Sequence, residues 1–280
     1  MDYKKPSEVV SVMVQSGIDK VQLSTTDLMI RGILAGAILG FGTTLAITAS
    51  IQTGLPVIGA AIFPACFIIV VLMGFELVTG NFAILPTAFL AKKITLADTL
   101  KNWLLVFFAN LLGGLLYAVL FWISLTQLGH DSGGPLAAAI VKIAETKTGA
   151  YAHFGSDGII TLFTKGILCN WMVTFGVVMA MTSTSTLGKI FAAWLPIFIF
   201  FAQGFEHAVV NMFIIPAGMM LGAKVSFGDW WFGNQLPVTF GNIAGGVIFT
   251  ALALYITYSK KKSIQSKHIH QPVGTTSDVE

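Results

Sequence analysis

Gly74-Phe-Glu-Leu-Val-Thr-Gly-Asn81 and Gly204-Phe-Glu-His-Ala-Val-Val-Asn211 are two copies of one short pattern, each within an otherwise apolar stretch of the chain. They place two carboxylates, Glu76 and Glu206, at matching positions. A carboxylate within a membrane span is costly, and such residues usually mark a substrate pathway. Two of them at equivalent places indicate a duplicated membrane pore.

The composition is that of a membrane protein. Of the 280 residues, 55% are hydrophobic and 10% are charged, whereas soluble domains carry about 25% charged residues. A membrane-spanning helix needs about 20 apolar residues. We therefore expect an all-α membrane protein with six transmembrane helices. The six apolar runs lie near residues 28–50, 57–91, 101–125, 159–181, 190–222 and 235–258.

The six expected helices fall into two copies of three. Residues 31–42 align with residues 165–176 at an offset of 134, the doubled Gly-Phe-Glu recurs at an offset of 130, and residues 102–114 resemble residues 234–246 at an offset of 132. Each copy has an odd number of spans, so the second copy crosses the membrane in the opposite sense. Inverted repeats place the functional site near the midplane. The expected transmembrane domain covers 28–258, with repeat one at 28–125 and repeat two at 159–258.

The second and fifth expected spans are too long for straight helices. Residues 57–91 as one helix would reach roughly 50 Å across a hydrocarbon core of about 30 Å. We therefore expect a break in helices 2 and 5, around the doubled pattern. Lipid cannot satisfy backbone amides, so a break at this depth must line a cavity or lie within protein. Helix-breaking residues are available there: Gly74, Gly80, Gly204, Pro64, Pro86 and Pro216.

Both chain ends are expected in the cytoplasm. Twelve of the sixteen lysine and arginine residues fall on the side of the termini, and basic residues favour the cytoplasmic side. Residues 1–27 have no continuous apolar core, unlike a signal peptide. Within them we expect an amphipathic membrane-surface helix, an anchor or a gate, that begins at Pro6 and ends at Gly17. Residues 259–280 are expected to be a disordered polar tail, and the net charge of +3 requires no nucleic-acid partner.

His207 is the one histidine within an apolar span, directly after Glu206 in the second break. Because an imidazole changes charge near neutral pH, we interpret His207 as a pore residue rather than a structural histidine. The same place in the first copy holds Leu77, followed by Thr79, whose hydroxyl can donate to an oxyanion or to the imidazole. Glu76 and Glu206 are interpreted as braces that accept hydrogen bonds, because an anion path would not display free carboxylates.

Buried amides are the other expected braces. Asn110 and Asn242 match each other in the repeat, and Asn170 stands where the first copy has Gly36. Buried asparagines commonly tie membrane helices together. The expected scaffold of the breaks is therefore Glu76, Asn81, Asn110, Asn170, Glu206, Asn211 and Asn242.

Resident metals, cofactors and enzymatic activity are not expected. His207 has no second histidine at helical spacing and no cysteine pair, so the usual metal-ligand patterns do not occur. A nucleophile elbow of the GxSxG kind is also absent from the sequence.

The same residues resemble the formate/nitrite transporter family over nearly the whole chain. The resemblance implies a homopentamer in the plasma membrane, in which each protomer has an aquaporin-like bundle of six helices and its own pore. The matching motifs are Glu76-Leu-Val-Thr-Gly-Asn81, Gly166-Ile-Leu-Cys-Asn170-Trp, Gly204-Phe-Glu-His207 with Asn211-Met-Phe-Ile-Ile-Pro216, and Pro237-Val-Thr-Phe-Gly-Asn242-Ile-Ala-Gly-Gly246.

By this resemblance, Thr79 and His207 are the central polar pair of the pore. The resemblance also implies a lysine in the outer vestibule, for which Lys147 is the candidate and Lys142 the alternative. The apolar constrictions that it implies are formed by Phe63, Phe67, Leu77 and Phe200.

The expected function is the passage of small monovalent anions of weak acids through the lipid bilayer. An acid with a pKa of about 3.7 is almost fully ionised at neutral pH, and burying that charge among apolar rings costs many kcal/mol. We hypothesise that the anion takes a proton, from His207 or from water, and crosses as the neutral acid. Formate is the favoured substrate because the family resemblance is nearer to formate-type members, with nitrite and hydrosulfide as alternatives. A neutral-solute channel is disfavoured because paired Asn-Pro-Ala motifs do not occur, and a non-transporting scaffold is the remaining rival.

Overall fold

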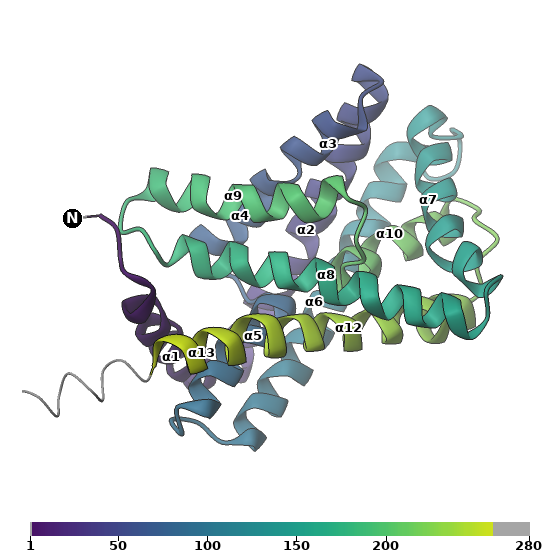
Figure 1. Ribbon diagram of the computed structural model, residues 1–280. Helices are drawn as coiled ribbons and strands as arrows, with labels where there is room; N and C mark the ends of the chain where they lie inside the picture. Colours follow the sequence, from purple (N-terminus) through teal and green to yellow (C-terminus); the bar gives the residue numbers. More distant parts are fainter. Residues whose placement is uncertain (1, 260–280) are drawn as a thin grey trace, which may run out of the picture.

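The computed structural model describes residues 2–259, and this part of the chain is almost entirely helical (Figure 1). The expected polar tail at 259–280 lies outside the described residues apart from Ser259. The helices are α1 (Pro6–Gln22), α2 (Thr25–Thr53), α3 (Pro56–Ile62), α4 (Pro64–Leu72), α5 (Val78–Leu90), α6 (Leu96–Thr126), α7 (Gly134–Ala152), α8 (Ser156–Ala180), α9 (Thr186–Ala202), α10 (Ala208–Met220), α11 (Phe227–Trp230), α12 (Leu236–Gly246) and α13 (Ala253–Tyr258), with π-helical turns η1 (Trp231–Gln235) and η2 (Val247–Leu252) on either side of α12.

Four helical stretches of the described chain are long and apolar enough to cross a membrane: α2, α6, α8 and the continuous run from α11 to α13. They contain 29, 31, 25 and 32 residues, or about 38–48 Å at 1.5 Å per residue. The other two expected runs each correspond to a pair of shorter apolar segments, 56–72 with 78–90 and 186–202 with 208–220. The prediction of an all-α protein built from apolar helices is confirmed.

Matching capping boxes begin two of the long stretches. The Thr95 hydroxyl accepts from the Asp98 amide, and the Asp98 carboxylate accepts from the Thr95 amide, which satisfies free donors at the start of α6. Ser226 and Asp229 make the same exchange at the start of α11. The two boxes lie 131 residues apart, so the internal repeat extends to the way these helices start.

Five residues leave helical geometry between each pair of shorter segments, at 73–77 and at 203–207. Gly74 and Gly204 both adopt a φ of +65°, in the left-handed region that side chains disfavour. The doubled sequence pattern therefore coincides with two equivalent stretches of non-helical backbone.

The expected helix-breaking residues do not all break a helix. Pro64 separates α3 from α4, as its missing amide hydrogen permits at the first turn of a helix. Pro86 and Pro216, however, lie inside α5 and α10, and Gly80 lies inside α5, so their prediction as breaks is wrong. All three are buried, and a membrane helix tolerates proline where surrounding protein satisfies the freed carbonyl.

Besides α11, which continues into the sixth apolar run, the helices α1 and α7 lie outside the six runs. No helix was expected over residues 134–152, where the structure has α7. The N-terminal helix α1 begins at Pro6 as expected, but the prediction that it ends at Gly17 is wrong, since it continues to Gln22. Gly17 serves a close contact instead of a helix end, because a Cβ atom there would overlap the Ala88 side chain of α5.

Glycines bring the backbones of the long helices into contact. Helix α2 packs along α6, and α8 packs along α12 (Figure 1). A Cβ atom on Gly113 would overlap the Ile33 carbonyl, and a Cβ atom on Gly245 would overlap the Ile167 carbonyl. These two crossings are equivalent in the repeat, and small residues are what allows such close approach in membrane helices.

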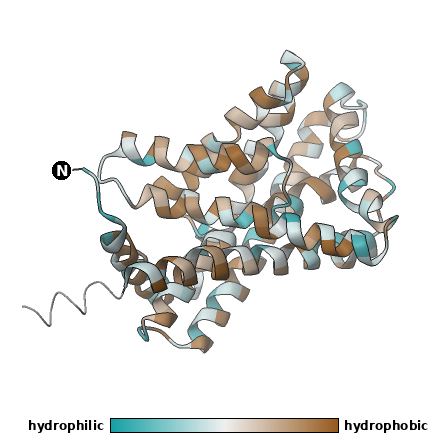
Figure 2. Ribbon diagram, viewed as in Figure 1, coloured by the Kyte–Doolittle hydropathy of each residue, from teal (hydrophilic) through white to brown (hydrophobic). Residues whose placement is uncertain are grey.

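Most of the helices are rich in hydrophobic residues (Figure 2), and many large apolar side chains are exposed on the outside of the bundle. Isolated apolar residues are normal on soluble proteins, whereas an extensive apolar exterior indicates contact with lipid or with protein. Examples that expose more than half of their surface are Phe41, Leu104, Ile160, Phe191, Phe232 and Phe240.

The start of the chain is tied to the turn between α8 and α9. The Asp2 carboxylate accepts hydrogen bonds from the hydroxyls of Ser183 and Thr184 and from the amides of Thr184 and Ser185. These donors hold the pKa of Asp2 well below its usual value of 3.8. The stabilisation is therefore present above that value and is lost as the pH falls through the lower pKa of the folded state.

We predict that Asp2→Asn loosens the first turns of α1 at neutral pH, because an amide cannot replace the charged acceptor of these hydrogen bonds. Hydrogen exchange measured by mass spectrometry in detergent should be faster at Glu8 to Val12 in the variant. Asp19→Asn makes the same charge change at an exposed site on the same helix and should leave that exchange unchanged. Equal exchange in Asp2→Asn and wild type would contradict the prediction.

Candidate functional site

The two glutamates of the doubled pattern are buried and bonded within their own breaks. Glu76 and Glu206 each expose 2% of their surface. Asn81 Nδ2 donates to Glu76 Oε2 at 2.9 Å, and Asn211 Nδ2 donates to Glu206 Oε2 at 2.8 Å. Each carboxylate thus connects the non-helical stretch to the first turn of the helix that follows it.

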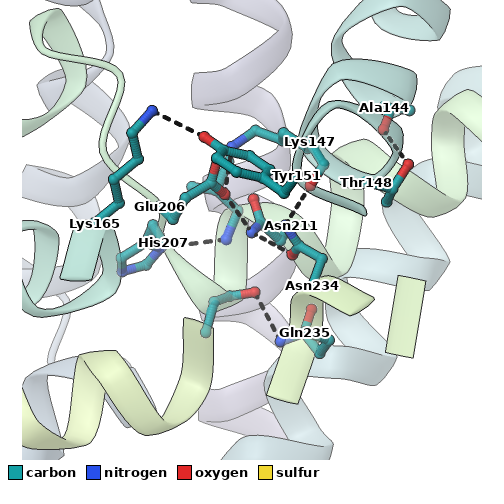
Figure 3. A network of polar contacts seen from close by, with 12 residues as sticks. Ala144, Lys147, Thr148, Tyr151, Lys165, Glu206, His207, Asn211, Asn234 and Gln235 are labelled. Atoms are coloured by element: carbon teal, nitrogen blue, oxygen red, sulfur yellow. Dashed lines mark hydrogen bonds and ion pairs between the residues drawn. The ribbon is translucent and has the colours of Figure 1, made fainter. Parts of the chain in front are cut away.

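Each glutamate also pairs with a lysine from a helix outside the six apolar runs. Lys20 Nζ of α1 lies 2.7 Å from Glu76 Oε1, and Lys147 Nζ of α7 lies 2.8 Å from Glu206 Oε2 (Figure 3). A buried carboxylate without a cation is strongly unfavourable, so α1 and α7 complete the two breaks. Lys20 was not among the predicted site residues, although a second buried glutamate implied a second cation.

Asn110 and Asn242 hold the backbone on both sides of the breaks. Asn110 Nδ2 donates to the carbonyls of Glu76 and Gly32, both at 2.8 Å, and its Oδ1 accepts from the Val78 amide at 2.9 Å. One side chain therefore satisfies a carbonyl and an amide that the helices cannot. Asn242 makes the same set of bonds in the second copy, to the carbonyls of Glu206 and Gly166 and to the amide of Ala208.

Three further buried asparagines extend this network. Asn170 Nδ2 donates to the carbonyls of Thr79 at 3.1 Å and Asn242 at 2.6 Å, so it joins the two copies. Asn102 and Asn234 accept, at 2.9 Å and 2.8 Å, from the asparagines that end the doubled pattern. Neither was predicted as a site residue, and their equivalence in the repeat was the available signal.

Thr79 and His207 meet although they come from different copies. Thr79 Oγ1 lies 2.9 Å from His207 Nε2, and the two residues expose 0% and 3% of their surface. Thr79 is the second residue of α5, and His207 directly precedes α10. The sequence prediction of a central polar pair thus has its two members in hydrogen-bond contact.

The hydrogen bonds of the imidazole assign its tautomer. The Val210 amide donates to His207 Nδ1 at 3.2 Å, so Nδ1 carries a lone pair and the proton of the neutral ring is on Nε2. Nε2 therefore donates to the Thr79 hydroxyl oxygen. That hydroxyl has no other partner among residues 2–259, so its own hydrogen is available to a ligand.

Two cavities approach this pair from the two ends at which α1 and α7 lie (Figure 1). The α7 cavity has a volume of about 510 Å³ and is lined by His207, Phe200 and Lys147, among others. The α1 cavity has a volume of about 290 Å³ and is lined by Leu77 and Phe67, among others. The two cavities share no lining residue.

Buried aromatic rings pack against the polar pair. Phe200 stacks on the His207 ring at a centroid distance of 5.7 Å and meets Phe63 edge to face at 5.9 Å. Phe63 is 1% exposed and lines neither cavity. Of the other two predicted apolar residues, Phe67 and Leu77, both line the α1 cavity.

Lysines lie on the walls of both cavities. Lys147 lines the α7 cavity, whereas the alternative candidate Lys142 is exposed and does not line it. Lys4, Lys20 and Lys189 line the α1 cavity. The charge of Lys147 is balanced by Glu206 and that of Lys20 by Glu76, which leaves Lys4 and Lys189 as the further basic residues of the α1 cavity.

Two helix N-termini also point towards the centre. Helices α5 and α10 begin at Val78 and Ala208, on either side of the contact between Thr79 and His207. A helix N-terminus carries about half a positive charge and favours anions. Among residues 2–259 no three histidine, cysteine or acidic side chains gather as a metal site would require.

Comparisons with known proteins agree with this geometry. Residues 7–256 match the family model described as formate/nitrite transporter. The uncharacterised transporter YrhG of Bacillus subtilis (strain 168) is 34% identical over 93% of this chain and 96% of its own length, and the formate channel BtFdhC of Bacillus thuringiensis is 34% identical over 94% and 99%.

Solved structures share the fold. An FNT family ion channel superposes with a TM-score of 0.78 at 25% identity, over 89% of this chain and 98% of its own. A pentameric formate channel with formate bound superposes with a TM-score of 0.69 at 24% identity, over 84% and 98%.

We predict that Lys147→Met destabilises the protein by about 3–5 kcal/mol, because it leaves the buried Glu206 carboxylate without its cation. Replacing both partners in Lys147→Met/Glu206→Gln should restore most of the lost stability. Thermal unfolding in detergent measures both effects. Lys142→Met, on the exposed face of the same helix, is the matched control, and its stability should stay close to that of wild type. A double variant as unstable as Lys147→Met alone would contradict the predicted cost of the unpaired carboxylate.

Proposed function

Because the chain belongs to the formate/nitrite transporter family, we propose that it is a transmembrane channel for small monovalent anions of weak acids, with formate as its substrate. The family is one of transporters and not of enzymes. The observation that carries the proposal is the buried contact of Thr79 with His207, which lies beside apolar side chains and between two cavities that are both lined by lysine.

The proposed architecture has six membrane crossings arranged as two inverted repeats. The segments α3–α5 and α9–α10 each form one broken crossing, and the equivalent glutamate, asparagine and lysine contacts of the two breaks support this assignment. The excess of basic residues near the termini puts the α1 cavity in the cytoplasm and the α7 cavity outside. We further propose a homopentamer in the plasma membrane, supported by the pentameric formate channel of the same fold and by the apolar exterior.

The anion path leads from one cavity to the other past Thr79 and His207. The carboxylates of Glu76 and Glu206 are neutralised by their lysines, so they do not repel an anion at close range. The N-termini of α5 and α10 and the free Thr79 hydroxyl hydrogen then offer favourable contacts to the negative charge. The imidazole favours this orientation of the Thr79 hydroxyl. Its Nε2–H donates to the hydroxyl oxygen, so the hydroxyl hydrogen points away from the ring.

Proton coupling through His207 requires a second proton on the ring. Uptake at Nδ1, from water in the α7 cavity, displaces the Val210 amide from that atom. The Nε2 proton can then pass to the Thr79 oxygen while the hydroxyl proton passes to the anion. The anion leaves as the neutral acid, Thr79 is regenerated, and the ring returns to its resting tautomer by proton exchange with cavity water.

We predict that His207→Asn removes the pH dependence of formate flux between about pH 5 and 8, because it removes the imidazole through which the proposed proton transfer to Thr79 runs. Asparagine keeps an acceptor suited to cap the Val210 amide and an amide donor for Thr79, but does not titrate. Thr79→Ala should lower flux at every pH by about tenfold or more, since it removes a hydrogen bond to a charged ligand. Uptake of labelled formate into proteoliposomes measures both.

His153→Asn changes an exposed histidine outside the pathway and serves as the control. A pH profile of His207→Asn equal to that of wild type would sink the proton relay and leave a passive anion filter. Stronger competition by nitrite or hydrosulfide than by unlabelled formate would contradict formate as the substrate. Osmotic swelling with uncharged solutes would instead support a neutral-solute channel.

A further inference from the structure

Gln235 is a completely buried amide to which the proposed pore chemistry gives no role. Its Nε2 donates to the backbone carbonyl of Ala208 at 3.1 Å (Figure 3), and its Oε1 accepts from Trp230 Nε1 at 3.3 Å. A buried amide is costly unless its polar atoms are bonded. Here one of those bonds reaches the residue directly after His207.

The first copy has a different residue at this place. At the offset of 132 that relates α6 to the run from α11 to α13, Gln235 corresponds to Trp103. Trp103 Nε1 donates to the carbonyl of Asn81, the fourth residue of α5, at 3.2 Å. The second copy instead braces Ala208, the first residue of α10. In the copy that carries His207, the side-chain donor therefore bonds the first residue of the helix after the break, whereas in the other copy it bonds the fourth.

Helix geometry changes at the same position. Trp231–Gln235 form the π-helical turn η1, whereas the corresponding stretch of α6 is regular α-helix. A π turn accommodates an additional residue and is frequent at functional sites. The turn ends at Gln235, so this departure from the repeat accompanies the change of brace.

Ala208 is held at both of its backbone polar groups. Its amide donates to the Asn242 side chain at 2.8 Å, and its carbonyl accepts from Gln235. Two residues later, the Val210 amide fixes the His207 ring through Nδ1. We propose that Gln235 is a positioning residue for His207, which holds the first turn of α10 so that the ring proton stays on Nε2.

This inference rests on the proposed pore role of His207. Among residues 2–259, the charged groups next to the ring are Glu206, its neighbour in the chain, and Lys147 of α7, which pairs with that carboxylate. Gln235 is neutral and bonds to neither of them. Its replacement therefore changes the support of the ring without changing the charge around it.

Gln235→Met tests the proposal, because methionine keeps the length and the apolar stem but has no amide to donate. The histidine nitrogens are observed by solid-state NMR in bilayers that contain protein labelled with ¹⁵N-histidine. The signals absent from His207→Asn identify the ring. We expect the Nε2–H tautomer alone in wild type and a mixture of both tautomers in Gln235→Met, with a shifted pH profile of formate uptake and about three- to tenfold lower flux at pH 7.

Trp103→Phe is the matched control, since it removes the equivalent brace from the copy without the histidine. It should leave the His207 signals and the pH profile as in wild type. Gln235→Asn keeps the amide but is one methylene too short to reach Ala208, and should reproduce the change of tautomer if Gln235→Met does not fold.

Unchanged His207 signals in the Gln235 variants, or the same change in Trp103→Phe, would overturn the positioning role. The nitrogen spectra do not depend on transport. Absence of formate flux in wild type would therefore refute the proposed function, while the tautomer measurement would still decide the role of Gln235.

Discussion

Backbone polar groups at membrane depth must be satisfied by the protein, because lipid offers no hydrogen bonds. At both breaks this constraint is met by one asparagine that bonds a carbonyl and an amide at once, Asn110 in the first copy and Asn242 in the second. The buried glutamates bring a second requirement, since each needs a cation. Helices α1 and α7 supply those cations. The two buried glutamates therefore account for the positions of these two helices, which lie outside the apolar runs.

The two copies satisfy these demands with equivalent residues, but they differ where a ligand would pass. Leu77 of the first copy corresponds to His207 of the second, Gly36 to Asn170 and Trp103 to Gln235. Asn170 bonds the Thr79 carbonyl, and Gln235 bonds the Ala208 carbonyl, so both additional amides act on residues that belong to or adjoin the polar pair. The contacts that the two copies share thus form the scaffold, and the three positions at which the copies differ lie at or next to the polar pair of Thr79 and His207.

Much of this was accessible from the sequence because periodicity and self-similarity are local properties. The apolar runs, the doubled Gly-Phe-Glu and the asparagines that match in the repeat predicted the apolar helices and most of the buried network, but not α7. Lys20 escaped prediction because its partner Glu76 is 56 residues away, and no local pattern joins them. Gly17 and Pro86 were misjudged for a related reason: both favour helix ends in isolation, whereas in the fold Gly17 contacts α5 and Pro86 is enclosed by protein.

Magnitudes argue for passage as the neutral acid. Protonating an acid with a pKa of about 3.7 at pH 7 costs roughly 4–5 kcal/mol, at 1.36 kcal/mol per pH unit. Carrying the anion through the apolar rings costs several kcal/mol even after relaxation, and about 20 kcal/mol in the limit of a dry interior. The helix N-termini and the Thr79 hydroxyl return about 2–5 kcal/mol, but only where they reach, beside the polar pair. At Leu77 and Phe67 on one side, and at Phe200 on the other, the charge has no such contact, and this is the physical reason why the proposed function includes protonation at the pair.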